Sequence, residues 1–367
     1  MKLENNQVFL SLVRLGIDHF DYNSHLFQLD NKTLAIDWCQ IKQLAEEQGL
    51  SAIVLDDIEK LPEKKRPEQT ILLQWIGEVL QEYEARYQAY EKTISEMAGF
   101  YNQHGFKMMV LKGYACSLDW PKPSHRPCGD IDIWQFGDYK NADKSVAKEK
   151  MVEIDSSHHH HTVFYWDDFM VENHFDFINV HHHKSNAEFE KILKSLAQND
   201  DYHVEISGER VYLPSPNLHA LFLLRHAMME FASTGINLRQ LLDWAFFVEK
   251  HGKEIDWVWI ENILQEFGMM TLYNVFNAIC VEELGFEARI FSPILYNPSV
   301  KDNVLDDILH PRYDNKDAHQ SNVLGRLIFK YRRWKGNAWK RELCYGENTW
   351  ASFWNGVWNH ILKPASI

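Results

Sequence analysis

The sequence predicts an α+β fold in which a mixed-sheet core lies between helical regions at the two ends of the chain. Residues 1–98 and 214–367 carry apolar positions three and four apart, which is the spacing of amphipathic helices. Residues 99–213 carry short apolar and alternating runs instead, which is typical of β-strands. The length of 367 residues fits two domains, or one domain with helical extensions. We therefore expect three regions with these boundaries.

The helical regions are predicted from their periodicity and their end signals. Asp37 precedes an amphipathic stretch that Gly49 ends, and a longer stretch runs from Gln69 to Gln103. Three further stretches with helical spacing lie in the C-terminal region, at 218–232, 238–252 and 257–269.

The core is predicted to contain several strands with helices between them. The expected strands are Lys107–Leu111, Asp130–Phe136, His159–Trp166, Phe169–Phe177 and a short one within Val204–Leu213. The third and fourth are separated only by Asp167 and Asp168, so they form a predicted hairpin. Helices are expected at Tyr114–Trp120 and from about Ala142.

Composition narrows the class of protein. Hydrophobic residues make up 45% and charged residues 25%, which is ordinary for a globular protein with a sizeable core. The formal net charge of −14 disfavours long nucleic acid as a partner, because neutralising phosphates needs clustered Lys and Arg. It leaves room for one local basic pocket.

Cysteine usage and hydropathy predict a soluble, cytoplasmic protein. The five cysteines are scattered with no close-spaced pair, as in a reducing compartment. The first residues are too polar for a signal peptide. The apolar stretches fall short of the ~20 residues that a membrane-spanning helix needs, so no membrane association is expected.

Asp130 and Asp132 are the strongest candidates for chemistry. Residues two apart on a strand point to the same face, so their two carboxylates would repel each other without a cation between them. Mg²⁺ takes carboxylate oxygens and keeps positions open for phosphate. Two such ions hold the attacking and leaving oxygens of an in-line phosphoryl transfer. The spacing thus predicts a site for two Mg²⁺ ions.

Three residues before this strand are suited to bind phosphate. Lys112 and Gly113 lie between a predicted strand and a predicted helix, where a glycine lets backbone N–H groups approach a phosphate. Arg126 lies four residues before Asp130, and its guanidinium can bind a phosphate through two hydrogen bonds. The structural alternatives are an ordinary strand-to-helix turn for Lys112-Gly113 and an ion pair with Asp130 or Asp132 for Arg126.

The segment from LKG through the proline-rich loop and Arg126 to GDIDIW resembles the bacterial uncharacterised nucleotidyltransferase family, within the DNA polymerase β-like superfamily. The resemblance covers roughly residues 30–270, and DIDIW is its most specific part. It implies a nucleotidyltransferase-type core and a third carboxylate on a later strand. FMVENHFDF resembles the family segment in which a carboxylate is followed two residues later by His, so the resemblance assigns Glu172 as the third metal ligand and His174 beside it.

Strand alternation also places Asp176 on the face of Glu172, so Asp176 is the alternative third ligand. A solvated, charged strand face is the structural alternative.

Two departures from the superfamily pattern stand out. Tyr114 follows the glycine where Ser is common, and the third acid is Glu rather than Asp.

The resemblance implies transfer of a nucleoside monophosphate from a nucleoside triphosphate (NTP), with release of pyrophosphate. Asp130, Asp132 and Glu172 are then the catalytic and metal-binding residues, and Lys112, Gly113, Arg126 and His174 bind the nucleotide. The acceptor is left open among a small molecule, a sugar and a protein side chain. The alternative is a catalytically inactive nucleotide-binding module or an antitoxin-like module with a protein partner.

Other features have simpler expectations. The runs His158–His161 and His181–His183 are expected to bind metal only weakly, because only alternate histidines on a strand share a face and no Cys-x-x-Cys lies nearby. A metal-binding protein built on these runs is the third hypothesis. Arg239 and Asp243, four apart on a predicted helix, are expected to form a structural ion pair. Trp350, Trp354 and Trp358 form a predicted core or interface stripe.

Overall fold

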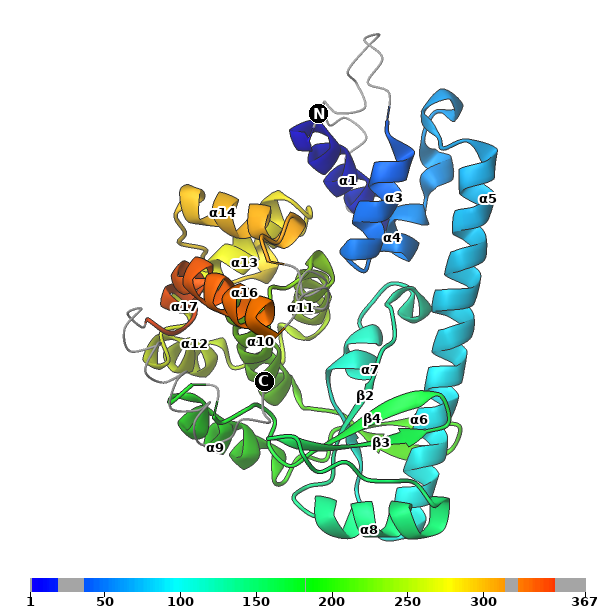
Figure 1. The fold of residues 1–367 in the computed structure, drawn as a ribbon, viewed down its shortest axis with the longest axis vertical. Helices are drawn as coiled ribbons and strands as arrows, with labels where there is room; N and C mark the ends of the chain where they lie inside the picture. The colour runs from blue at the N-terminus through cyan, green and yellow to red at the C-terminus, as the bar shows by residue number, and fades with distance from the viewer. Residues whose placement is uncertain (1, 19–35, 182, 314–322, 347–367) are drawn as a thin grey trace.

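A computed structural model of the chain describes residues 2–18, 36–181, 183–313 and 323–346. It is a mixed α+β structure in which one six-stranded sheet lies among many helices, as the sequence predicts (Figure 1). The tryptophan stripe at 350–358 lies outside the described residues. None of the described helices is both long enough and apolar enough to cross a bilayer.

The sheet combines parallel and antiparallel pairs. Its strands are β1 (Met109–Val110), β2 (Ile131–Trp134), β3 (His161–Trp166), β4 (Phe169–His174), β5 (His203–Ile206) and β6 (Glu209–Tyr212). They lie in the order β3-β4-β2-β1-β6-β5. The pairs β2–β4 and β1–β6 are parallel, whereas β1–β2 and the two hairpins β3–β4 and β5–β6 are antiparallel. The predicted β3–β4 hairpin is confirmed.

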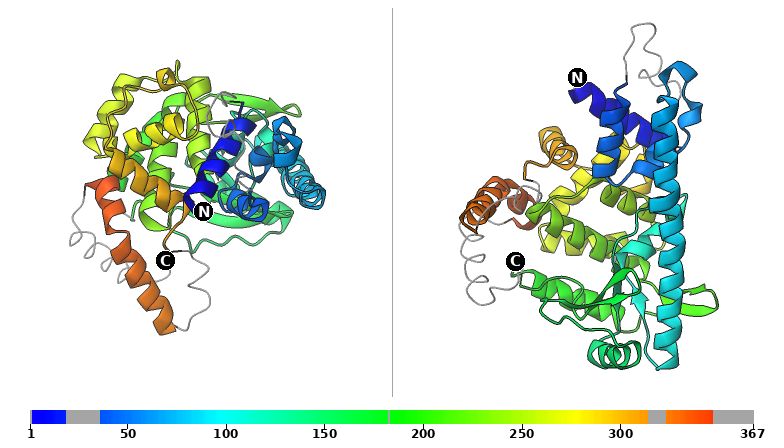
Figure 2. Two further views of the ribbon diagram at one scale, coloured as in Figure 1. Left: turned by 90° about the horizontal axis from the view of Figure 1, so that it is seen from above. Right: turned by 45° about the vertical axis from the view of Figure 1, so that its right-hand side comes forward.

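A long helical rod connects the N-terminal helices to the sheet. The N-terminal elements are α1 (Lys2–Gly16), α3 (Trp38–Glu47), α4 (Ser51–Leu55), η1 (Ile58–Lys60), η2 (Glu63–Lys65), α5 (Gln69–Glu78), the π-helical η3 (Val79–Ala85) and α6 (Arg86–Gln103). The last three follow one another without a break and extend along one side of the molecule (Figure 2, right). The predicted helix over 69–103 is therefore confirmed, with a π-helical segment inside it.

The remaining helices cover the sheet and form the C-terminal region. Those of the core are α7 (Lys112–Ser117), η4 (Pro123–His125), α8 (Tyr139–Lys150) and α9 (Asn186–Ala197). Those of the C-terminal region are α10 (Pro216–Ser233), α11 (Leu238–His251), α12 (Trp257–Glu266), α13 (Met270–Glu282), η5 (Ala288–Ile290), α14 (Pro298–Leu309), α16 (Val323–Gly336) and α17 (Ala338–Tyr345).

Two strand predictions are corrected by local hydrogen bonding. Residues 204–213 form a hairpin rather than one strand, because Ser207 and Gly208 both have positive φ (52° and 86°) and reverse the chain between β5 and β6. The strand predicted to reach Phe177 ends at His174. The next two amides, at residues 175 and 176, donate to the carbonyl of His160 instead of continuing the strand.

The two faces of the sheet pack against different helices. Ile131 and Ile133 belong to a hydrophobic core that includes side chains of α6 and α8. Trp134 belongs to a second core, which includes side chains of α10, α11 and α13. Because side chains alternate along a strand, Asp132 points to the same face as Trp134. The fold therefore directs Asp132 toward the C-terminal helices.

A buried carboxyl holds the segment that follows β4. Glu190 of α9 accepts hydrogen bonds from the backbone N–H groups of Phe177 (2.9 Å) and Ile178 (3.1 Å). Burial raises the pKa of Glu190 to about 7. This carboxyl thus takes up a proton on folding at mildly acidic pH.

We predict that Glu190 makes stability depend on pH. Between an unfolded-state pKa near 4.5 and the folded value of about 7, the folded chain holds a proton that the unfolded chain has lost. The free energy of unfolding should therefore fall as pH rises through this window, by on the order of 2–3 kcal/mol. Urea unfolding of the parent and of Glu190→Gln at several pH values measures the difference. Glu188→Gln, an exposed glutamate on the same helix, is the control. An unchanged slope in Glu190→Gln would contradict the prediction.

Candidate active site

Strand register brings the predicted acidic residues together. In the parallel pair β2–β4, Asp132 lies directly opposite Glu172. Asp130 immediately precedes β2, and His174 ends β4. Lys112 begins α7, directly after the short strand β1. Side chains from three neighbouring elements therefore meet at one end of β2.

Asp132 is the centre of this cluster. It is only 2% exposed, and its Oδ1 lies 2.9 Å from His174 Nε2 and 3.1 Å from Lys112 Nζ. His174 Nε2 also lies 3.5 Å from Glu172 Oε2. Asp132, Glu172 and His174 each offer a ligand atom within 4.8 Å of the other two, which is close enough to share a metal ion. The structure thus brings together the residues that the sequence predicts for this site.

The acidic and basic groups of the cluster stabilise one another's charged forms. Burial alone would raise the pKa of Asp132, but Lys112 and His174 hold it well below its usual range. Burial alone would lower the pKa of His174, but hydrogen bonds to Asp132 and Glu172 raise it to about 9. Burial, and then the charge of Asp132, raise the pKa of Asp130. Asp132 is therefore a carboxylate neutralised by two cations, whereas Asp130 forms no ion pair with another described residue.

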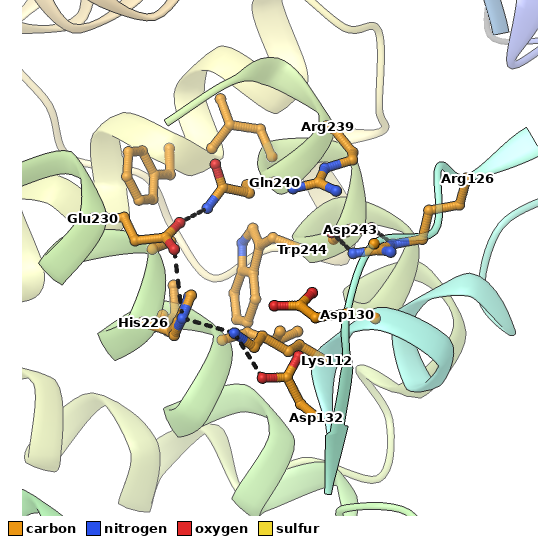
Figure 3. A pocket seen from close by; sticks show the side chains of 17 residues that line it. Lys112, Arg126, Asp130, Asp132, His226, Glu230, Arg239, Gln240, Asp243 and Trp244 are labelled. Carbon is orange, nitrogen blue, oxygen red and sulfur yellow. Dashed lines mark hydrogen bonds and ion pairs between the residues drawn. The ribbon is translucent and has the colours of Figure 1, made fainter. Parts of the chain in front are cut away.

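A cavity of about 270 Å³ opens beside these residues (Figure 3). Five of the seven predicted site residues line it: Lys112, Gly113, Arg126, Asp130 and Asp132. Glu172 and His174 of β4 are not lining residues; His174 contacts Asp132, and Glu172 contacts His174. The other walls come from α10, α11 and α13.

Gly113 is required by a close approach of the chain. A Cβ atom at this position would lie 2.6 Å from the hydroxyl oxygen of Tyr90. That hydroxyl donates a 2.8 Å hydrogen bond to the backbone carbonyl of Asp130. The glycine therefore lets Tyr90 of α6 fix the backbone at the start of β2, a role that the sequence alone did not predict.

Asp243 pairs with a different arginine from the one predicted. Its carboxylate accepts two hydrogen bonds from Arg126, at 2.8 and 2.9 Å, and one from Trp120 Nε1 at 2.8 Å. The expected pair of Asp243 with Arg239 is therefore wrong, as is a pair of Arg126 with Asp130 or Asp132. The bidentate pair ties the loop before β2 to α11, so it does hold the C-terminal helices to the core.

Arg239 lines the cavity with a buried side-chain nitrogen. Its buried Nε makes no hydrogen bond within the described part of the chain. Burial, and then the nearby charge of Arg126, lower its pKa. In Figure 3 its guanidinium lies on the same side of the cavity as that of Arg126. This leaves a buried donor for an anion in the cavity.

Another wall of the cavity carries polar residues of α10 and α11. The sequence predicts only that they lie in largely apolar helices, and assigns them no role in the site. His226 Nε2 lies 3.3 Å from Lys112 Nζ and 3.6 Å from Glu230 Oε1 (Figure 3). Gln240 of α11 donates to Glu230, and Trp244 lines the cavity beside them. The spacing of His226 and Glu230, four apart on a helix, was the available signal. Which core residue they face follows only from the packing of α10 on the sheet.

Asp176, the alternative third ligand, lies away from the cluster. It follows the end of β4, and its carboxylate pairs with Lys194 of α9. Strand alternation does not apply to it, because the strand ends at His174. Glu172 is the acidic residue of β4 that contacts the cluster.

A family model described as "uncharacterised nucleotidyltransferase" matches residues 35–284, which is more than half of the chain. The chain belongs to this family. The matched range of this nucleotidyltransferase includes all seven predicted site residues and the α10 and α11 residues that line the cavity. No curated protein and no solved structure matches the chain. The LKG and DIDIW segments predict this uncharacterised nucleotidyltransferase family, and that family is confirmed.

We predict that Asp243→Asn destabilises this nucleotidyltransferase. The change leaves the buried Arg126 guanidinium without its counter-charge, which costs roughly 3–5 kcal/mol of unfolding free energy. Urea unfolding followed by circular dichroism measures it. The matched control is Lys191→Gln, which breaks an exposed pair with Glu188 and should cost less than about 1 kcal/mol. Equal effects of the two changes would contradict a structural role for the Arg126–Asp243 pair.

Proposed function

We propose that the chain is a metal-dependent nucleotidyltransferase that transfers a nucleoside monophosphate from an NTP to an acceptor hydroxyl. The observation that carries the proposal is the placement of Asp132 opposite Glu172, beside a cavity that Asp130 and Lys112 line, in a chain of this family. Carboxylates from two adjacent strands are what such chemistry requires, because they bind cations that in turn bind phosphate.

The residues fit a divalent cation. Asp132 and Glu172 both have lowered pKa values despite burial, because cationic neighbours favour their charged forms. Asp130 adds a third carboxylate that faces the cavity (Figure 3). Asp130, Asp132 and Glu172 would hold Mg²⁺, two ions in the proposed complex. When bound, Mg²⁺ neutralises charge on the phosphates and aligns them.

The basic residues of the cavity would bind the triphosphate. Lys112 already pairs with Asp132 and would extend to a phosphate once a metal ion takes over that carboxylate. Arg126 uses three of its five N–H groups on Asp243 and on the carbonyl of Pro127, which leaves two for a ligand. Gly113 would let the backbone approach the nucleotide, and His174 would hold Asp132 and Glu172 in place.

Transfer would proceed by in-line displacement. The acceptor oxygen attacks the α-phosphorus and forms a new P–O bond. The bond from that phosphorus to the bridging oxygen breaks, and pyrophosphate leaves. Glu172 is the proposed acceptor of the hydroxyl proton. Positioning and electrostatic stabilisation supply most of the rate enhancement in such reactions. The net charge of −14 favours a small molecule, a sugar or a protein side chain as acceptor over long nucleic acid.

A thermal-shift experiment tests nucleotide binding at this site. Mg²⁺ with an NTP at 100 times its dissociation constant should stabilise the parent by about 2.7 kcal/mol, or roughly 5 °C in a chain of this size. The double variant Asp130→Asn, Asp132→Asn should lose this shift. The matched control is Asp167→Asn, Asp168→Asn, the same change at two exposed positions of the β3–β4 turn. If the first double variant binds Mg·NTP as tightly as the parent, the site assignment is wrong.

A labelling experiment tests transfer and identifies the acceptor. The chain is incubated with Mg²⁺, cell extract and each NTP carrying label at the α-phosphate. We expect label in a new product with the parent and with the Asp167, Asp168 control, and none with the Asp130, Asp132 variant. Equal labelling with that variant contradicts the catalytic assignment. Binding without labelling in any extract supports the inactive nucleotide-binding module instead.

A further inference from the structure

Three histidine rings meet beside the acidic cluster. They belong to His160 and His161, at the end of the HHHH run, and to His174 of β4. The sequence predicts only weak metal binding here, because successive strand residues point to opposite faces. That reason does not hold in the structure, since β3 begins at His161 and His160 precedes it. Adjacent histidines can therefore direct their rings to one place.

Backbone hydrogen bonds bring the three rings together. His161 lies opposite His174 in the antiparallel β3–β4 pair. The carbonyl of His160 accepts from the amides of residues 175 and 176, at 2.9 and 3.1 Å, and this holds His160 against the end of β4. The ring centroids of His160 and His161 are 4.4 Å apart. The ring centroid of His174 lies 5.3 Å from that of His160 and 5.2 Å from that of His161. The cluster is thus built into the hairpin.

The ring nitrogens have the spacing of metal ligands. His160 Nε2 and His161 Nδ1 are 3.2 Å apart. Two nitrogens on one tetrahedral zinc ion, at Zn–N distances of ~2.0–2.1 Å, lie roughly 3.3 Å from each other. Each of the three histidines offers a nitrogen within 4.8 Å of the other two. Small rotations of the rings would bring all three onto one ion.

The hydrogen bonding of the His160 and His161 rings is incomplete. Each neutral imidazole ring carries one N–H group and one nitrogen lone pair, and the lone pair can bind a metal. Two neutral rings carry two N–H groups, and only one can lie between them. The remaining nitrogens, His160 Nδ1 and His161 Nε2, are buried and find no partner among the described residues. In either tautomer one buried N–H is unsatisfied, which costs free energy without a ligand nearby.

We propose that His160, His161 and His174 bind a first-row divalent transition metal, zinc above all, as a second centre that shares Glu172 with the carboxylate site for Mg²⁺. Imidazole nitrogens suit zinc and its neighbours, whereas Mg²⁺ takes oxygen ligands. Glu172 is positioned as the fourth ligand, because its Oε2 lies 3.5 Å from both His161 Nδ1 and His174 Nε2. A cation here would replace the His174 proton in neutralising Glu172 and Asp132.

Cobalt(II) titration of the full chain tests the proposal. The protein is prepared without a histidine tag, and any bound metal is first removed with a chelator. We expect one Co²⁺ per chain, with the intense visible absorption of a tetrahedral nitrogen-ligated ion, and displacement by Zn²⁺. His160→Ala and His161→Ala should weaken the affinity by about 100-fold or more. His158→Ala is the matched control, because it removes an exposed histidine of the same run and should change the affinity little.

Two results would overturn the proposal. One is an equal loss of affinity in His158→Ala and His160→Ala, which indicates binding by the run as an unstructured tract. The other is unchanged affinity in variants at His160 and His161 whose circular dichroism and urea unfolding match the parent. Asp130→Asn separates this proposal from the proposed function, because Asp130 lies outside the histidine cluster. That variant should lose stabilisation by Mg·NTP and keep its Co²⁺ spectrum.

Discussion

The candidate site depends on the parallel pairing of β2 with β4. This register places Asp132 opposite Glu172 and leaves His174 within 2.9 Å of the Asp132 carboxylate. A shift of one residue would turn Asp132 toward the apolar core formed with α6 and α8. Register is strongly specified because Ile131 and Ile133 fill that core. The buried face of the sheet therefore determines the geometry of its polar face.

Charge balance explains how an acidic protein holds buried acids. Asp132 cannot remain ionised in the interior without nearby cations, and Lys112 and His174 supply them. Asp130 lines the cavity and forms no ion pair with another residue in the described part of the chain. A divalent ion with a triphosphate would rearrange these pairs while keeping the site close to neutral. The net charge of −14 thus coexists with a local group of cations at the cavity.

The C-terminal helices complete the cavity, and one buried ion pair joins them to the loop before β2. Arg126 comes from the loop before β2, and Asp243 comes from α11. Asp243 is thereby not paired with Arg239, which lines the cavity and whose buried Nε has no hydrogen-bond partner among the described residues. His226 and Glu230 of α10 reach the same space. The cavity is therefore formed jointly by the core and by the C-terminal helices α10, α11 and α13.

The α+β class, most helices and the acidic and basic residues that meet at Asp132 were predictable from the sequence. Periodicity and local motifs act over a few residues, so they are readable without a structure. The tertiary structure decided the partner of Asp243, the exclusion of Asp176 and the meeting of the three histidines. Each depends on where a strand ends or on which helix packs beside it, and such contacts join residues far apart in the chain. The histidine cluster shows this most clearly, since its geometry follows from two backbone hydrogen bonds to His160 that no local pattern predicts.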